Sequence, residues 1–151
     1  MSSTTAFARI CDGIVAALLV APALAGSHVE RARRVPVPVE WDEHIEVRVG
    51  IADGTKPFVG PGTPGVWETQ VVIDCYARAA AGDQPYDRLD ALLSAVDERI
   101  QAVDLGALGV TDVSPAVHIE WDFEPGANPQ ALASYGFTVR HDVRGTGLRV
   151  S

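Results

Sequence analysis

The chain has 151 residues, of which 47% are hydrophobic and 21% charged, and its formal net charge is −8. That length suits one domain with a substantial core, and that composition excludes a wholly disordered chain. The acidic balance disfavours a protein that coats DNA, because phosphate contacts need clustered lysine and arginine, although like charge would let DNA pass without being gripped. The two cysteines, Cys11 and Cys75, are far apart in sequence, and we expect both to be small apolar core residues in a reducing compartment.

The first predicted element is a helix from about Thr5 to Val20. Ser3, Thr4 or Thr5 can cap it, and it ends before Pro22 and Gly26. One face carries apolar residues at helical spacing, namely Phe7, Ile10, Cys11, Ile14, Val15, Leu18 and Leu19. A secretory signal is the alternative, since small residues follow the apolar run, but Asp12 offsets Arg9 directly before it. The run is also shorter than the roughly 20 apolar residues of a membrane span, so a cover helix is favoured.

Two strands are expected next. Residues 29–35 alternate loosely, and the prolines at 36 and 38 confine them to an edge strand or a connector that exposes Arg31, Arg33 and Arg34. The second strand alternates apolar with polar residues and should have one wet face; its apolar positions are Ile45, Val47, Val49 and Ile51.

Residues 52–65 are rich in proline and glycine and are predicted to form a long protruding loop. Lys56, Phe58 and Val59 lie in this stretch. Its two apolar residues either fold back on the body or dock on a neighbouring subunit.

The segment from Trp67 to Arg78 is predicted to be an inner strand covered on both faces, because Val71, Val72 and Ile73 leave neither face polar. A second helix should follow, with Asp83 as its cap and Pro85 in its first turn. Its buried stripe is expected to be Leu89, Leu92, Leu93, Val96, Ile100 and Val103. Its acidic residues, Asp87, Asp90, Asp97 and Glu98, are expected on a solvated face.

Two further strands complete the chain. In the first, Val117, Ile119, Trp121 and Phe123 point one way, and His118, Glu120 and Asp122 point the other. The last runs from about Ala133 to Val143, with Tyr135, Phe137, Val139 and Val143 inward and Arg140, Asp142 and Arg144 outward. The predicted fold class is α+β: a mixed or antiparallel sheet of about five strands with two main helices packed on one face, in a single domain spanning 1–151.

The strongest candidate for a metal site is His118, Glu120 and Asp122, because period-two spacing places all three on one strand face. The same pattern is typical of any half-buried strand, so a solvated face is favoured. Neither common phosphate-binding glycine pattern is present, nor a nucleophile elbow. The sequence therefore predicts no catalytic residue, cofactor or metal.

With these elements in place, the chain resembles the tail terminator (minor tail or tail-completion) proteins of long-tailed bacteriophages over about residues 5–145. The likeness lies in the order of five segments and above all in the junction from Cys75-Tyr-Ala-Arg to the acidic helix. Those segments are the helix at 10–19, the Arg-rich strand with a Pro-x-Pro step at 31–38, the strand at 45–49, the strand at 67–78, and the helix at 86–96.

The resemblance implies a structural virion protein and not an enzyme: a ring, usually a hexamer, in the neck of the phage tail. Such a ring is assembled in the host cytoplasm, caps the tail tube, stops its polymerisation and joins the tail to the head-side connector. Its partners would be copies of itself, the tail-tube protein and a neck protein, with DNA passing through the lumen unbound and no membrane involved. The interface residues guessed from the sequence are Lys56, Phe58, Val59, Arg31, Arg33, Arg34, Arg140 and Arg144.

Two alternatives remain open. One is another ring of the same neck, such as a head–tail connector or head-closure protein. The other belongs to a different class: a small α+β ligand-binding or metal-dependent enzyme domain that uses His118, Glu120 and Asp122.

Overall fold

The chain forms a two-layer α+β fold, seen in a computed structural model that describes residues 5–31, 37–38, 40–55, 65–79, 84–125 and 129–143. Its elements are α1 (Ala6–Leu19), η1 (Leu24–Ser27), β1 (Val29–Arg31), β2 (Glu43–Thr55), β3 (Gly65–Arg78), α2 (Pro85–Ala102), η2 (Gly106–Leu108), β4 (Val110–Glu124) and β5 (Gln130–Val143). This order confirms the predicted succession of helix, two strands, strand, helix and two strands.

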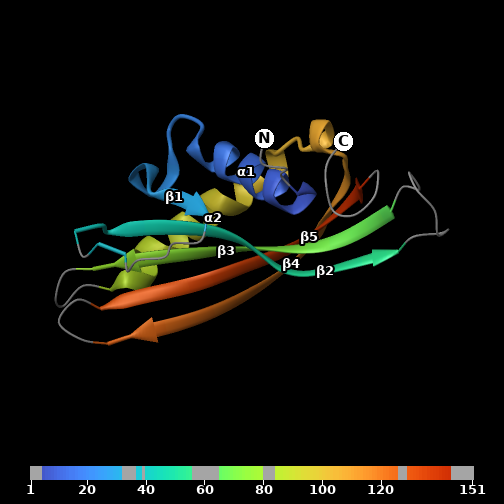
Figure 1. Cartoon of the computed structure of the whole chain (residues 1–151). Helices are drawn as coiled ribbons and strands as arrows, with labels where there is room; N and C mark the ends of the chain where they lie inside the picture. Colours follow the sequence, from blue (N-terminus) through green and yellow to red (C-terminus); the bar gives the residue numbers. More distant parts are fainter. Residues whose placement is uncertain are drawn as a thin grey trace.

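The five strands form one mixed sheet in the order β1-β2-β3-β5-β4. β1 pairs with β2 in parallel, and the other three pairings are antiparallel. Both helices lie over the same face of this sheet (Figure 1). The predicted fold class is therefore confirmed, including the placement of the helices.

Helix α1 forms where its apolar stripe predicts it. The Oγ1 of Thr5 accepts a hydrogen bond from the amide of Ala8 at 3.2 Å and so caps the first turn. The helix buries Ala6, Ile10, Cys11, Ile14 and Leu18 against β1 and β2. Both cysteines are buried free thiols, as expected. Neither helix in the described part of the chain has the length and apolar content needed to cross a membrane.

Helix α2 begins at Pro85, whose missing N–H is harmless in a first turn. The residue at the N-cap is Gln84, which makes no side-chain capping bond; the predicted cap, Asp83, lies outside the described residues. The predicted stripe of Leu89, Leu92, Leu93, Val96 and Ile100 is buried against β3 and β5. Val103 follows the helix as its C-cap and is half-buried.

A single arginine connects the two helices. Arg99 on α2 donates hydrogen bonds to the carbonyl oxygens of Ala17 and Val20, both at 2.9 Å, and of Pro22 at 2.6 Å. Ala17 lies in the last turn of α1 and Val20 is its C-cap, so their carbonyls have no helical partners, and Pro22 follows the helix. Arg99 therefore satisfies the C-terminal end of one helix from the side of the other.

The central strand β3 differs from its prediction. Val71 and Ile73 are buried under the helices, but the helices cover one face only. Val72 lies on the other face, which we call the open face, and is still only 7% exposed because it lies among polar side chains of that face such as Arg48 and Gln70. β3 is an inner strand, as predicted, but no helix of the described residues lies over its open face, where the sequence predicts cover.

The hairpin of β2 and β3 is longer than the sequence indicates. Residues 52–55 and Gly65 belong to the strands, so the predicted loop is too long at both ends; residues 56–64 lie outside the described part. The pairing register shifts between Val49 and Ala52. The spacing in the sequence predicts Ile51 on the buried face, but because of this shift its side chain points away from that face and is 65% exposed.

The buried histidine of β5 predicts a pH dependence of stability. His141 is fully buried, its ring bonds to the hydroxyl of Thr69 at 2.7 Å, and desolvation lowers its pKa below the ordinary value of 6.5. The unfolded chain therefore takes up a proton at a higher pH than the folded chain does, so stability falls as the pH drops below 6.5. We expect a loss of at most about 1 kcal/mol between pH 6.5 and 5.5 from this residue, measured by urea unfolding.

The variant His141→Gln should flatten the pH dependence of the free energy of unfolding. An unaltered pH profile in His141→Gln would contradict the assignment.

Candidate functional site

The helical layer is too narrow for the sheet. Helices pack about 10 Å apart and strands about 4.8 Å apart, so each helix covers about two strands. Helix α1 lies on β1 and β2, and α2 lies on β3 and β5. The edge strand β4 therefore has no helix above it.

The apolar side of β4 is consequently exposed. Trp121 is 57% exposed, Val117 40% and Phe123 39%, although all three point toward the helical side as predicted. Only Ile119 among the predicted inward residues packs on the core. At one end the ring of Tyr86 on α2 stacks on Phe123, with centroids 5.5 Å apart. The expectation that this strand buries its apolar face is wrong, because the covering helix stops short of it.

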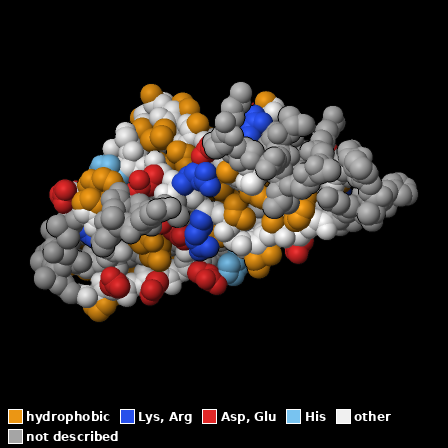
Figure 2. Space-filling view, in the orientation of Figure 1, with side chains coloured by type: hydrophobic (Ala, Val, Ile, Leu, Met, Phe, Trp, Pro, Cys, Tyr) orange, Lys and Arg blue, Asp and Glu red, His pale blue; other side chains and the backbone are white. Residues whose placement is uncertain are grey.

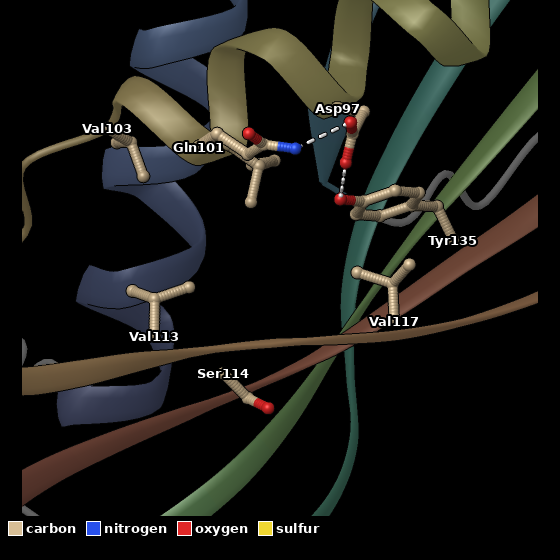
Figure 3. A pocket seen from close by; sticks show the side chains of 8 residues that line it. Asp97, Gln101, Val103, Val113, Ser114, Val117 and Tyr135 are labelled. Carbon is tan, nitrogen blue, oxygen red and sulfur yellow. Dashed lines mark hydrogen bonds between the residues drawn. The ribbon is translucent and has the colours of Figure 1, made fainter.

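A cavity of about 350 Å³ lies between α2 and β4 (Figure 3). Val113, Val117 and Ser114 line it from the strand, and Asp97 and Gln101 line it from the helix. We use the name α2–β4 groove for the surface that joins this cavity to the exposed stripe. It is bounded by Tyr86, Asp97, Gln101, Val117, Trp121 and Phe123.

The polar side chains of the cavity form one chain of hydrogen bonds. The hydroxyl of Tyr135 donates to Oδ1 of Asp97 at 2.5 Å, and the amide of Gln101 donates to Oδ2 at 2.8 Å (Figure 3). Burial and the bond to Asp97 together raise the pKa of Tyr135, so the phenol stays protonated. Asp97 therefore tethers α2 to β5 instead of lying on a purely solvated face.

Replacing Tyr135 with phenylalanine should lower the free energy of unfolding by about 1.5–3 kcal/mol, because a hydrogen bond to a carboxylate is lost while the buried ring is retained. Urea unfolding measures this change. The double variant Tyr135→Phe with Asp97→Asn should lose little more than the single variant. Full additivity of the two losses would contradict a direct interaction.

The open face of the sheet is polar and mostly acidic. Arg48 pairs with Asp74 at 2.8 Å, and Asp74 accepts from the hydroxyl of Ser134 at 2.6 Å. Alternation along the strands places these carboxylates on the open face: Glu46, Asp53, Glu68, Asp74, Asp112, Glu120 and Asp122. Figure 2 shows acidic side chains along the lower rim of the molecule, where Figure 1 places β4.

The candidate metal triad does not converge. Nε2 of His118 lies 3.0 Å from Glu120, with both side chains exposed, but Oδ1 of Asp122 accepts from the backbone amide of Phe123. Within the described ranges, no group of three His, Cys, Asp or Glu residues could hold a metal ion.

Burial raises the pKa of Cys75 to about 12, so that thiol stays protonated.

Two of the eight residues predicted to form an interface, Arg31 and Arg140, lie within the described residues, and they are on different faces of the sheet. Arg31 is exposed on the edge strand β1, 3.5 Å from Asp12, on the side of the sheet that carries the helices. Arg140 lies on the open face of β5, beyond β2 and β3. The other six guessed residues, Lys56, Phe58, Val59, Arg33, Arg34 and Arg144, lie outside the described residues.

An aromatic cluster that the sequence does not predict lies at the β1 end of the sheet. The rings of His28 and Trp41 stack with centroids 3.9 Å apart, and His44 lies between Trp41 and Tyr76. His44 is buried and its Nε2 lies 2.9 Å from Glu30. These residues come from three separate segments, so no local spacing in the sequence could have revealed the cluster.

Two surfaces therefore remain as functional candidates: the α2–β4 groove and the acidic open face. The groove was foreseeable in part, because the sequence predicts two helices for five strands. Comparison of the chain with protein-family models and with curated proteins gives no match.

Proposed function

We propose that this chain is a structural protein of a phage tail, which forms a ring on the end of the tail tube, stops its growth and joins it to the neck. The proposal starts from the resemblance of the ordered segments over residues 5–145 to tail terminator proteins. The fold is compatible with it, since the sheet backed by helices on one face leaves the other face free for contacts.

The observation that carries the proposal is the acidic open face. A large polar sheet face on which no helix of the described ranges lies is suited to face a channel or a partner. Carboxylates such as Glu68, Asp112 and Glu120 would repel the phosphates of passing DNA, so that DNA moves through the ring without being held. We accordingly place the open face toward the lumen.

The test is a tube-growth assay with purified tail-tube protein of the same phage. Electron microscopy of negatively stained samples should show rings, and six copies of 16.0 kDa give a mass of about 96 kDa. Tubes polymerised with the protein present should be shorter and should carry a ring at one end. Tubes of unchanged length without bound protein would overturn the proposal, and rings that bind a neck protein but ignore tubes would favour a head–tail connector.

The proposal that the open face points toward the lumen is tested separately, by DNA binding to charge variants. A variant with Glu68→Lys, Asp112→Lys and Glu120→Lys should form the same rings and gain affinity for double-stranded DNA at low salt. A matched variant with Asp87→Lys, Glu98→Lys and Asp104→Lys on the helical layer should bind less DNA within the ring. Equal DNA binding by both variants would contradict the orientation.

A further inference from the structure

We propose that the α2–β4 groove receives the α1–β1 edge of a second copy of this chain, so that the copies join head to tail. By α1–β1 edge we mean the flank of α1 and β1 that faces away from α2, represented by Leu19 and Arg31. This inference rests on the proposed ring and names the two surfaces that would build it.

The groove is a place where one layer of the fold is missing. Trp121, Val117 and Phe123 form an apolar floor beside α2, and the described part of the chain provides no element above it. An exposed apolar patch of this kind is typical of an interaction surface. What it lacks is a helix that lies beside α2 and above β4.

The opposite edge of the same molecule can supply that helix. β1 and β4 are the two edges of the sheet, and α1 lies directly over β1. A second copy placed beside β4 in the same orientation therefore brings its own α1 next to the bare floor. The helical layer would then run from copy to copy in the order α1, α2, α1, α2.

The exposed side chains of α1 support this placement. Asp12 pairs with Arg31 on β1, which shows the side of α1 that faces the sheet edge. Leu19 follows Asp12 by two helical turns and so lies on the same side, where it is exposed. Leu19 is thus an apolar side chain at the edge, available to fill the cavity between α2 and β4.

The groove carries carboxylates, and the opposite edge carries an exposed arginine that can pair with one of them. Asp90 and Asp97 lie on the same side of α2 as Tyr86, along the wall of the groove. Arg31 is exposed on the opposite edge, beside Asp12. A groove-to-groove contact would instead set these carboxylates against their own copies, so the charges favour a head-to-tail contact over a symmetric one.

The experiment blocks each surface in a separate variant and then mixes the variants. Trp121→Asp should disrupt the groove, and Leu19→Asp should disrupt the edge. At a concentration at which the wild type assembles, each variant alone should therefore have the monomer mass of 16.0 kDa. A mixture in equal amounts retains one good groove and one good edge. It should therefore form a heterodimer of two chains, about 32 kDa, and nothing larger.

The control is Ile51→Asp, which places the same charge at another exposed apolar position and should keep the wild-type mass. Circular dichroism reports whether each variant is folded. Arg31→Glu and Asp90→Arg change only exposed side chains and provide a second route if Trp121→Asp does not fold. Each should weaken assembly, and the two together in one chain should restore it.

The inference would be overturned if the wild type stays monomeric at high concentration, or if assembly survives Trp121→Asp or Leu19→Asp. It would also be overturned if the mixture stays monomeric, or if the double charge variant does not regain assembly. Failure of the proposed function is distinguishable: tubes capped by rings that survive both apolar variants would refute only this interface. Rings built through this interface that leave tube length unchanged would refute only the function.

Discussion

Replacing Phe137 with alanine is expected to lower the free energy of unfolding by about 3–5 kcal/mol, the largest loss that we expect from a single truncation. Phe137 lies on β5, fully buried between β3 and β4, and is paired with Val71 and Val117 in the two neighbouring strands. The loss combines the apolar surface no longer buried with a cavity that rigid strands cannot close. Since domains are stable by about 5–15 kcal/mol, this variant should be close to unfolding at room temperature.

The matched control for this prediction is Phe123→Ala on the adjacent strand. Phe123 is 39% exposed and its ring stacks on Tyr86, so the same chemical change should lower the free energy of unfolding by about 1–2 kcal/mol. Both values come from urea unfolding under conditions in which the protein is monomeric. Equal losses at the two positions would mean that burial does not decide the effect and would contradict the described core.

Arg99→Met is expected to give the second largest loss, about 2–3 kcal/mol. The substitution retains the apolar stem but removes the guanidinium that donates to the carbonyls of Ala17, Val20 and Pro22. Hydrogen bonds from a charged donor contribute about 1.5–3 kcal/mol, and the exposure of part of this group keeps the sum well below three full contributions. Loss of this contact should also loosen α1 relative to α2, which amide hydrogen exchange in α1 would detect.

Arg88→Met on the same helix is the control, because Arg88 makes an exposed ion pair with Asp42 at 3.3 Å. Its loss should be about 0.5 kcal/mol or less. Arg99→Lys should fall between the two, since one ammonium cannot match the geometry of a guanidinium toward three carbonyls. If Arg99→Met were as stable as Arg88→Met, Arg99 would have no structural role in joining the helices.

Local patterns predicted the elements well where the period of the element alone decides which of its sides is buried. The stripe from Ile10 to Leu18 and the stripe from Leu89 to Ile100 were recognised by their 3.6-residue spacing, and both are buried. Pro85 marked the first turn of α2. Alternation in β5 correctly placed Tyr135, Phe137 and Val139 inward.

The errors occur where several elements decide one side chain. Val72 is apolar on a face without helices, and alternation cannot tell whether a second layer exists above a face. Ile51 changed sides because of a register shift, which depends on pairing with β3 and leaves no mark in the local pattern. The spacing of His118, Glu120 and Asp122 gave their common face, but not the backbone bond that turns Asp122 away.

The sequence by itself determined the α+β class, the two helical stripes and the direction in which most strand residues point, because these follow from the periods of helices and strands. Only the tertiary structure decided that Trp121 and its neighbours are exposed and that the carboxylates of three strands share one open face. The physical reason is that cover and charge density depend on how many strands each helix spans and on strand order. Those are relations between distant segments, which no period within a single segment records.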